Sequence, residues 1–328
     1  MFKVCLIGCG SVATSGHGPS LKKYVASHPD TLLAGCCDLD AERAEIYRQT
    51  FGFARAYTDY EVMLDTEKPD VVSLICTASK TCELSIALMK KGYHILLEKP
   101  PGDTLEEITA MVAESKLHPD LHIRTAFNRR YTPLLARLKE ELAGQRIYNI
   151  TYQLYRHSRN GDFANTAVHA IDAVKFIAGA DYQEAHITFQ ELPEVRENVA
   201  NFHMTADFEN GVMAQLAIIP MGGVTLERIT VNTPDRTYLA ELPFWSNMDS
   251  PGRLLAWEKD VPILNISGDT LVDSTEMFEE SGFYAEISSF FDRIRAGEPP
   301  ACDLESGIQS ADLANYLRTR RGYYKKQG

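Results

Sequence analysis

The sequence predicts a two-domain α/β protein, with a parallel sheet covered by helices in its first part and an open, mainly antiparallel sheet in its second. At 328 residues the chain is longer than single hydrophobic cores usually reach, so two domains are expected. Up to about residue 123, apolar strands alternate with helices. From residue 146 onward, apolar and polar residues alternate strictly, as in antiparallel sheets. We therefore place the domains at residues 1–123 and 124–328.

The first domain is predicted as a regular succession of strands and helices. Its strands are continuously apolar, which is typical of a parallel sheet with both faces covered. A Lys-Gly-Tyr sequence at 91–93 ends one helix, and Pro69-Asp70 precedes a strand. The expected strands are FKVCLI, LLAGCCD, ARAYT, VVSLICT and HILLE, and the expected helices lie near 19–27, 40–50, 59–66, 81–91 and 104–115.

The second domain is predicted from its alternating strands and two helices. Asn210-Gly211 supplies a tight hairpin turn between strands. Helices are expected over about 165–178 and 281–296, the second because its apolar residues recur at helical spacing. The residues expected on one face of the strand after 146 are Tyr148, Ile150, Tyr152 and Leu154.

The first strand runs into a glycine-rich turn, GCGSVA at 8–13, that opens a helix. Gly8 allows the tight turn, and Gly10 lets the backbone approach a pyrophosphate. The first N–H groups of the helix then face the phosphates. This order of residues predicts a Rossmann-type dinucleotide site, with Gly8, Gly10, Ser11 and Val12 among its cofactor-binding residues.

The second strand ends at Asp38, where a carboxylate can accept hydrogen bonds from ribose hydroxyls. Asp38 would repel the 2′-phosphate of NADP, so NAD is the expected cofactor and NADP the less favoured one. Arg43 is the nearest cation, and we expect it on a solvated helix face.

Composition excludes several classes of partner and compartment. The formal net charge is -12, and no cluster of Lys and Arg resembles a nucleic-acid footprint. No apolar run reaches membrane-spanning length, and the first residues show no signal peptide. The seven cysteines form no C-x-x-C pair, which favours buried free thiols over disulfides or a metal site. We therefore expect a cytoplasmic protein without nucleic-acid or membrane partners and without a metal.

The last apolar strand of the first domain ends in Glu98-Lys99-Pro100. Ligands of parallel sheets bind at the carboxyl ends of strands, so this charged pair is expected at the cofactor crevice. Pro100 restricts the backbone beside Lys99. The alternative is a pair of ordinary solvated charges.

With these motifs the chain resembles the Gfo/Idh/MocA (glucose-fructose oxidoreductase / inositol dehydrogenase) family. Further matching segments are Pro69-Asp70-Val71-Val72, Gly92 to Pro100, Asn128 to Pro133 and Val168 to Asp172. The resemblance implies a Rossmann domain followed by an open-sheet domain, in dimers or tetramers. It also implies oxidation or reduction of secondary alcohols on sugars and cyclitols with NAD or NADP.

The family's usual catalytic set is the lysine of the EKP sequence with an Asp and a His four residues apart. The resemblance places it at Lys99, Asn165 and His169, with Asn where the family commonly has Asp. An amide is no base at neutral pH. Because residues 165, 169 and 172 share a helix face, His169 becomes the expected base and Asp172 an orienting anion. The alternatives are a helix cap for Asn165 and a core position for His169.

A second departure lies at Thr77-Ala78, where the family often has Thr-Pro, and at Cys82, where it often has His. Thr77 and Ala78 can still form the loop beside the nicotinamide ribose. We include them with Glu98 among the cofactor-binding residues, and we assign Cys82 no role.

Positive charge gathers in two segments of this acidic chain, at Arg129 and Arg130 and at Arg156, His157 and Arg159. Arginine forks suit carboxylates and phosphates, so Arg129, Arg130 and Arg156 are predicted substrate residues. We include Asp172 with them. The substrate would then be a uronate, sugar phosphate or nucleotide sugar. Pairing of these arginines with the protein's own acids is the alternative, and it leaves a neutral sugar open.

These observations lead to the hypothesis of an NAD-dependent dehydrogenase or reductase acting on a secondary hydroxyl or ketone of a carbohydrate-like molecule. His169, assisted by Lys99, would remove the hydroxyl proton while hydride passes to nicotinamide. Two alternatives remain at this point. One is redox-neutral elimination or glycosidase chemistry with retained NADH, and the other is a dinucleotide-binding sensor without turnover.

Overall fold

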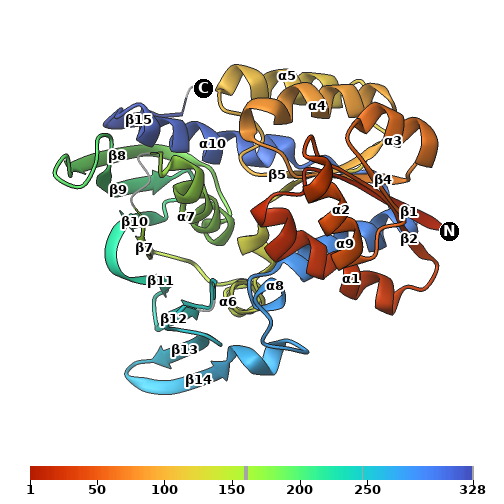
Figure 1. The fold of residues 1–328 in the computed structure, drawn as a ribbon. Coiled ribbons are helices and arrows are strands. Elements are labelled where there is room, and N and C mark those ends of the chain that lie inside the picture. Colours follow the sequence, from red (N-terminus) through yellow and green to blue (C-terminus); the bar gives the residue numbers. More distant parts are fainter. Residues whose placement is uncertain (159–161, 246, 327–328) are drawn as a thin grey trace. The chain divides into compact units, whose positions relative to one another are not determined.

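The computed structural model describes residues 1–158, 162–245 and 247–326. The described residues form two compact units, each considered by itself below (Figure 1). Unit 1 consists of Met1–Phe127 and Phe283–Ile308, and unit 2 of Asn128–Gly282 and Gln309–Gly328. No described helix has the length and apolar character that crossing a membrane requires.

The described part of unit 1 contains a six-stranded parallel sheet in the order β3-β2-β1-β4-β5-β6. The order reverses direction at β1, and such a switch point is where ligands bind in open parallel sheets. The strands are β1 (Phe2–Ile7), β2 (Thr31–Cys37), β3 (Arg55–Tyr57), β4 (Val71–Leu74), β5 (His94–Glu98) and β6 (Ile123–Ala126). The helices are α1 (Gly18–Ser27), α2 (Ala41–Phe51), α3 (Tyr60–Glu67), α4 (Ala78–Lys90), α5 (Leu105–Ser115) and α9 (Phe283–Arg295), with a π-helical segment η1 (Ala13–His17) before α1.

Apolar clusters cover both faces of this sheet, as its continuously apolar strands predicted. Val4 and Leu6 belong to one cluster, and Cys5, between them in β1, belongs to the other. The parallel, doubly covered sheet of the prediction is therefore confirmed.

The two compact units differ from the predicted domains, residues 1–123 and 124–328, in two places. β6 belongs to the parallel sheet, so unit 1 continues to Phe127. Helix α9 lies within unit 1 although it was assigned to the second domain. Its helical spacing was predicted, but spacing does not say which core receives the apolar face. Phe290 and Phe291 pack into the cluster that contains Val4, and the Phe291 ring lies 5.5 Å from that of Phe2.

Unit 2 holds a sheet of nine strands among its described residues, in the order β14-β13-β12-β11-β7-β10-β9-β8-β15. Its strands pair antiparallel except β7 and β10, which run parallel, so the mainly antiparallel prediction is confirmed. The strands are β7 (Asn149–His157), β8 (Tyr182–Glu191), β9 (Ala200–Phe208), β10 (Met213–Ile219), β11 (Met221–Asn232), β12 (Arg236–Leu242), β13 (Arg253–Glu258), β14 (Val261–Ser267) and β15 (Tyr323–Lys325).

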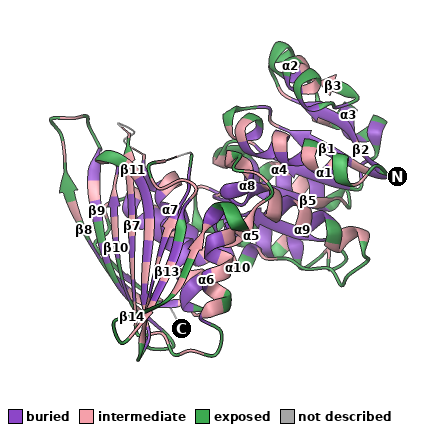
Figure 2. Ribbon diagram, turned by 90° about the horizontal axis from the view of Figure 1, so that it is seen from below, coloured by how far each residue is buried: buried purple, intermediate pink, exposed green. Residues whose placement is uncertain are grey.

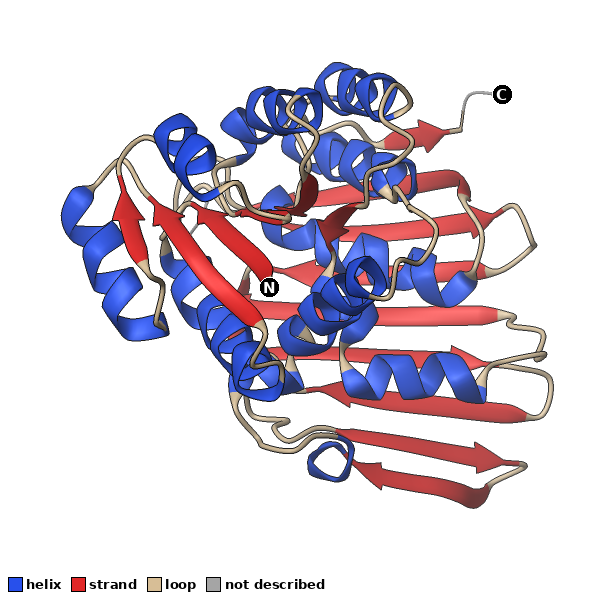
Figure 3. Cartoon of the chain, turned by 90° about the vertical axis from the view of Figure 1, so that its right-hand side faces the viewer, coloured by secondary structure: helices blue, strands red, loops and turns tan. Residues whose placement is uncertain are grey.

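Helices of unit 2 pack on this sheet: α6 contacts β12 and β13, and α7 contacts β7 and β10 (Figure 3). Buried residues alternate with more accessible ones along the strands (Figure 2). Ile150, Tyr152 and Leu154 are buried as predicted, whereas Tyr148 precedes β7 and is exposed. The helical elements are η2 (Asn128–Tyr131), α6 (Pro133–Glu141), α7 (Ala164–Ala178), η3 (Gly268–Leu271), α8 (Met277–Glu280) and α10 (Leu304–Arg318), which belongs to unit 2 from Gln309 onward.

Candidate cofactor site and catalytic residues

The glycine-rich turn after β1 has the geometry that a pyrophosphate site needs. Gly8 has a φ of +95°, and a Cβ there would lie 2.0 Å from the Ile75 carbonyl oxygen, so a side chain is excluded. A Cβ at Gly10 would meet no described atom within 4 Å, which leaves the backbone open to a close ligand. Ser11 and Val12 begin the helix. The turn therefore fits the phosphates of a dinucleotide.

Asp38 is held at this turn by backbone and side-chain donors. Its Oδ2 accepts a hydrogen bond of 2.8 Å from the Cys9 N–H, and its Oδ1 accepts one of 3.0 Å from the Asp40 N–H. The arrangement joins the end of β1 to the end of β2 and places a negative charge beside the phosphate turn. That charge suits the ribose hydroxyls of NAD and opposes a 2′-phosphate.

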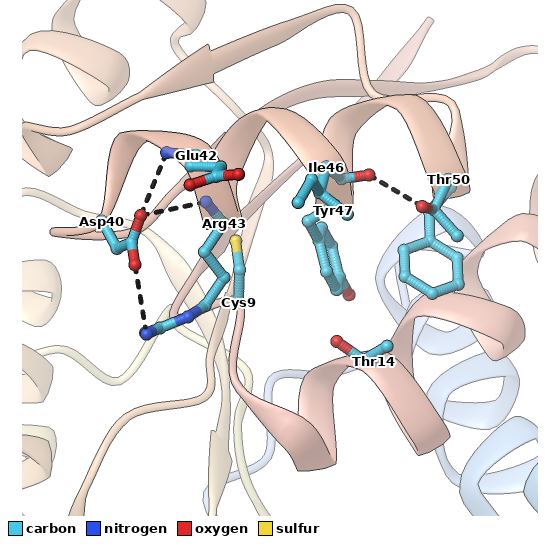
Figure 4. A pocket seen from close by; sticks show the side chains of 9 residues that line it. Cys9, Thr14, Asp40, Glu42, Arg43, Ile46, Tyr47 and Thr50 are labelled. Atoms are coloured by element: carbon cyan, nitrogen blue, oxygen red, sulfur yellow. Dashed lines mark hydrogen bonds and ion pairs between the residues drawn. The ribbon is translucent and has the colours of Figure 1, made fainter.

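Arg43 takes a more specific position than a solvated helix face. Its side chain is half-exposed, and its guanidinium pairs with Asp38 Oδ1 at 3.2 Å and with Asp40 Oδ2 at 3.3 Å. A pocket of about 250 Å³ adjoins it between η1 and α2, with Cys9 and Tyr47 in its lining (Figure 4). The cation thus stands at the predicted ribose end of the site and partly neutralises the two carboxylates.

A buried pair, which sequence reasoning missed, links β5 to the helix after the glycine turn. His17 Nε2 lies 2.8 Å from Glu98 Oε1, and Glu98 Oε2 accepts a hydrogen bond of 3.1 Å from the Lys99 N–H. His17 is fully buried, with the Phe283 ring against its edge. The Lys99-Pro100 peptide is cis. Glu98 therefore supports the backbone that carries Lys99. The sequence signal that could have revealed this pair is the histidine at position 17, shortly after the glycine-rich turn.

The loop after β4 retains the predicted residues but not the usual family histidine. Thr77 precedes α4, and its hydroxyl lies 3.2 Å from that of Ser79. Ala78 is the first residue of α4. Cys82 donates its thiol hydrogen to the Glu107 carbonyl oxygen at 3.3 Å, so its side chain is engaged with α5. Contact of Thr77 and Ala78 with a cofactor stays a prediction.

Helix α7 carries the predicted trio Asn165, His169 and Asp172. His169 and Asp172 are buried, at 7% and 1% exposure. Asp172 accepts hydrogen bonds from Arg130 Nη2 at 2.6 Å and Arg130 Nε at 2.8 Å. The Ser310 hydroxyl of α10 donates to the same carboxylate at 3.1 Å. The anion beside His169 is therefore already matched by a guanidinium.

Asn165 is not the cap of α7. The helix begins at Ala164, with Phe163 in the cap position, so Asn165 lies inside the first turn. Its Oδ1 accepts a hydrogen bond of 3.0 Å from Arg318 Nη2 of α10. Sequence reasoning missed α10, and with it Arg318 and Ser310 as partners of the α7 trio.

The other predicted substrate arginines meet a carboxylate of the protein itself. Arg129 Nη2 lies 2.7 Å from Glu227 Oε1, and Arg156 pairs with the same oxygen. The Tyr152 hydroxyl donates to Glu227 Oε2 at 2.8 Å. Burial alone would raise the pKa of Glu227, but Arg129 and Arg156 overcome that effect and lower the pKa to about 2. Arg159 lies outside the described residues.

Comparisons with known proteins agree with this fold. Residues 2–121 match the model of the Gfo/Idh/MocA oxidoreductase family, which has an NAD-binding Rossmann fold. A myo-inositol 2-dehydrogenase of Thermotoga maritima is 25% identical over 326 residues, covering 93% of this chain and 92% of that protein. A D-glucoside 3-dehydrogenase of Escherichia coli is 26% identical over 196 residues, covering 54% of each. The solved structure of a levoglucosan dehydrogenase in complex with NADH has a TM-score of 0.81 at 17% identity, covering 99% of this chain and 98% of that one.

The parallel sheet and the family match identify an NAD-binding oxidoreductase. Residues 2–121 carry the NAD-binding Rossmann domain of the Gfo/Idh/MocA family, as the motifs predicted.

Proposed function

We propose that this protein is an NAD-dependent dehydrogenase for a secondary hydroxyl of a sugar or cyclitol. The observation that carries the proposal is the buried His169 on α7, between Asn165 and Asp172. A relative that matches 93% of the chain is named as a myo-inositol 2-dehydrogenase. A buried imidazole on a helix that carries an acid and an amide at helical spacing suits proton transfer.

NAD, when bound, supplies the hydride acceptor at C4 of nicotinamide. His169 takes the hydroxyl proton as the carbon-bound hydrogen leaves with its electron pair. Asp172 and Arg130 form an ion pair one helical turn from His169. The carboxylate can therefore orient this part of the helix, while Arg130 offsets its negative charge near the imidazole. Lys99, on the loop supported by Glu98, assists the proton transfer.

The substrate we propose is a neutral polyol in preference to an anion. Arg129 and Arg156 share the single carboxylate of Glu227, and Arg130 pairs with Asp172, so all three guanidinium groups are engaged by two carboxylates inside unit 2. The named relatives act on inositol, a glucoside and levoglucosan. The three arginines would then shape the site and would not supply its anion affinity.

A substrate screen with NAD tests this function. Myo-inositol, alkyl glucosides, levoglucosan, uronates and nucleotide sugars are each incubated with protein and NAD, and NADH absorbance is followed. We expect steady NADH formation with a neutral polyol and a rate lower by about 10²-fold or more with the His169→Gln variant. Product without NADH release would indicate redox-neutral elimination. NAD binding without turnover of any compound would indicate a sensor.

We further infer a cytoplasmic homo-oligomer. The free thiols of Cys5, Cys9, Cys36 and Cys37 support a reducing compartment, because they are buried in unit 1 as small apolar side chains. The long open sheet of unit 2 supports association between copies. Light scattering during gel filtration measures the assembly, and a monomer mass would contradict it. Cell fractionation with an antibody tests the compartment.

A further inference from the structure

Helix α10 contacts both ends of the trio on α7. Arg318 binds Asn165, and Ser310 binds Asp172. Along α7 the two residues are seven apart, or about 10.5 Å of helix axis, and along α10 their partners are eight apart, or about 12 Å. The order of the contacts is reversed, so the two helices run antiparallel here with matching spacing. His169 lies between the two contacts.

Arg318 determines which way the Asn165 amide faces. A guanidinium has only donors, whereas an amide has an acceptor oxygen and a donor nitrogen. The contact of 3.0 Å therefore requires the Asn165 oxygen to face α10, with its nitrogen on the other side of the amide carbon. Arg318 is in turn held by Asp162, whose carboxylate oxygens lie 3.1 Å and 3.2 Å from Arg318 Nε.

We propose that Arg318 is a positioning residue that makes Asn165 a hydrogen-bond donor toward the substrate oxygen. The proposal rests on the proposed function, in which α7 presents the catalytic face. When the carbon-bound hydrogen leaves as hydride and His169 takes the proton, negative charge develops on the reacting oxygen. A fixed N–H donor stabilises that charge, while Asn165 itself exchanges no proton or electron.

This role accounts for an amide at position 165. An Asp at 165 would form an ion pair with Arg318, which would lower its pKa and make it a poor base. Asn with Arg318 instead gives a neutral donor of fixed orientation. Ser310 has a matching task at the other end, where it donates to Asp172 beside Arg130.

The first test compares kinetics with the polyol identified in the screen. Arg318→Gln should lower kcat about 10- to 100-fold, since removing a fixed donor usually costs about 10²- to 10³-fold. Arg318→Lys should recover part of the loss. The matched control is Arg321→Gln, because Arg321 stacks on Tyr316 of the same helix at 3.7 Å and leaves the α7 contacts in place. Melting temperature and NAD affinity should stay at control values.

A double-mutant cycle shows whether Arg318 acts through Asn165. Asn165→Ala combined with Arg318→Gln should lose no more rate than Asn165→Ala alone. Multiplied losses, or a kcat for Arg318→Gln equal to that of the Arg321→Gln control, would overturn the proposal. Full activity of His169→Gln would instead overturn the proposed function, so the two failures are distinguishable.

A second test needs no substrate. The imidazole pKa of His169 is measured by NMR titration in Asn165→Asp, with and without Arg318→Gln. Asp172 and Arg130 stay unchanged in all variants, so their charges cancel in the comparison. We expect a small shift while Arg318 pairs with the new carboxylate, and a clear rise in the pKa once Arg318 is replaced. Equal shifts in both backgrounds would contradict the pairing.

Discussion

The two units hold their functional groups in different ways. In unit 1, Asp38 is bonded to the Cys9 backbone, and both residues follow neighbouring strands of one sheet. In unit 2, Asp172 depends on Arg130 and on Ser310, which lie 42 and 138 positions away in the sequence. The predicted cofactor site, which is built on backbone groups, can therefore be recognised from a short motif, whereas the proposed catalytic face depends on side chains that are remote in the sequence.

The largest effect is expected at His169 in unit 2. Loss of a general base usually lowers the rate about 10²- to 10⁴-fold, so His169→Gln should remove most turnover. NAD affinity should stay the same, since the phosphate turn lies in unit 1. Turnover with the screened polyol and NAD titration measure the two quantities. A retained pH-rate limb of imidazole type would place the proton acceptor elsewhere.

Lys99 gives the corresponding test in unit 1. Lys99→Met should reduce kcat by about 10²-fold or more, with NAD affinity nearly unchanged, if the side chain assists proton transfer. Glu98 binds the backbone N–H of residue 99, so the substitution leaves that support intact. Loss of NAD binding in this variant would show that Lys99 serves the cofactor instead.

Glu227 tests how far unit 2 depends on buried charge. Its pKa is lowered to about 2 from an ordinary 4.5, so the ionised carboxylate stabilises the fold above pH 4.5 and this contribution is lost as pH falls toward 2. The contribution is on the order of 3 kcal/mol. Glu227→Gln should lower the free energy of unfolding by a similar amount at pH 7, because Arg129 and Arg156 lose their carboxylate.

The matched control for Glu227 is Glu45, whose pKa is also lowered to about 2, by hydrogen bonds from Arg48 and Gln49. The Glu45 side chain is 45% exposed, so Glu45→Gln should change the urea midpoint much less than Glu227→Gln. Urea unfolding at pH 7 and pH 4 measures both variants. Equal losses in the two would show that burial is not what matters.

The smallest expected effect is on cofactor preference. Asp38→Ala removes a charge that opposes the 2′-phosphate, so the preference for NAD over NADP should narrow about tenfold. Arg43 would then lose one of its carboxylate partners, so more of its positive charge would be available to attract the 2′-phosphate. Titration of both cofactors measures the change. Equal NADP binding by the unaltered protein would contradict the ribose assignment.

The sequence alone determined those features whose cause is local. Gly8 is required by a positive φ and a backbone carbonyl 2.0 Å from its missing Cβ, and such a turn leaves its mark in the residues themselves. The parallel sheet followed from continuous apolar strands, and the antiparallel one from alternation at Ile150, Tyr152 and Leu154. Helix periodicity likewise predicted that Asn165, His169 and Asp172 share one face of α7.

Only the tertiary structure decided which groups face those residues. Helical spacing in α9 predicts an apolar face but not that it packs in unit 1, because any core can bury it. Charge composition shows that Arg129 and Arg156 are cations, but Glu227 in β11 becomes their partner only when the sheet assembles. The orientation of the Asn165 amide depends on Arg318, 153 positions away, since side-chain hydrogen bonds require distances that no sequence pattern specifies.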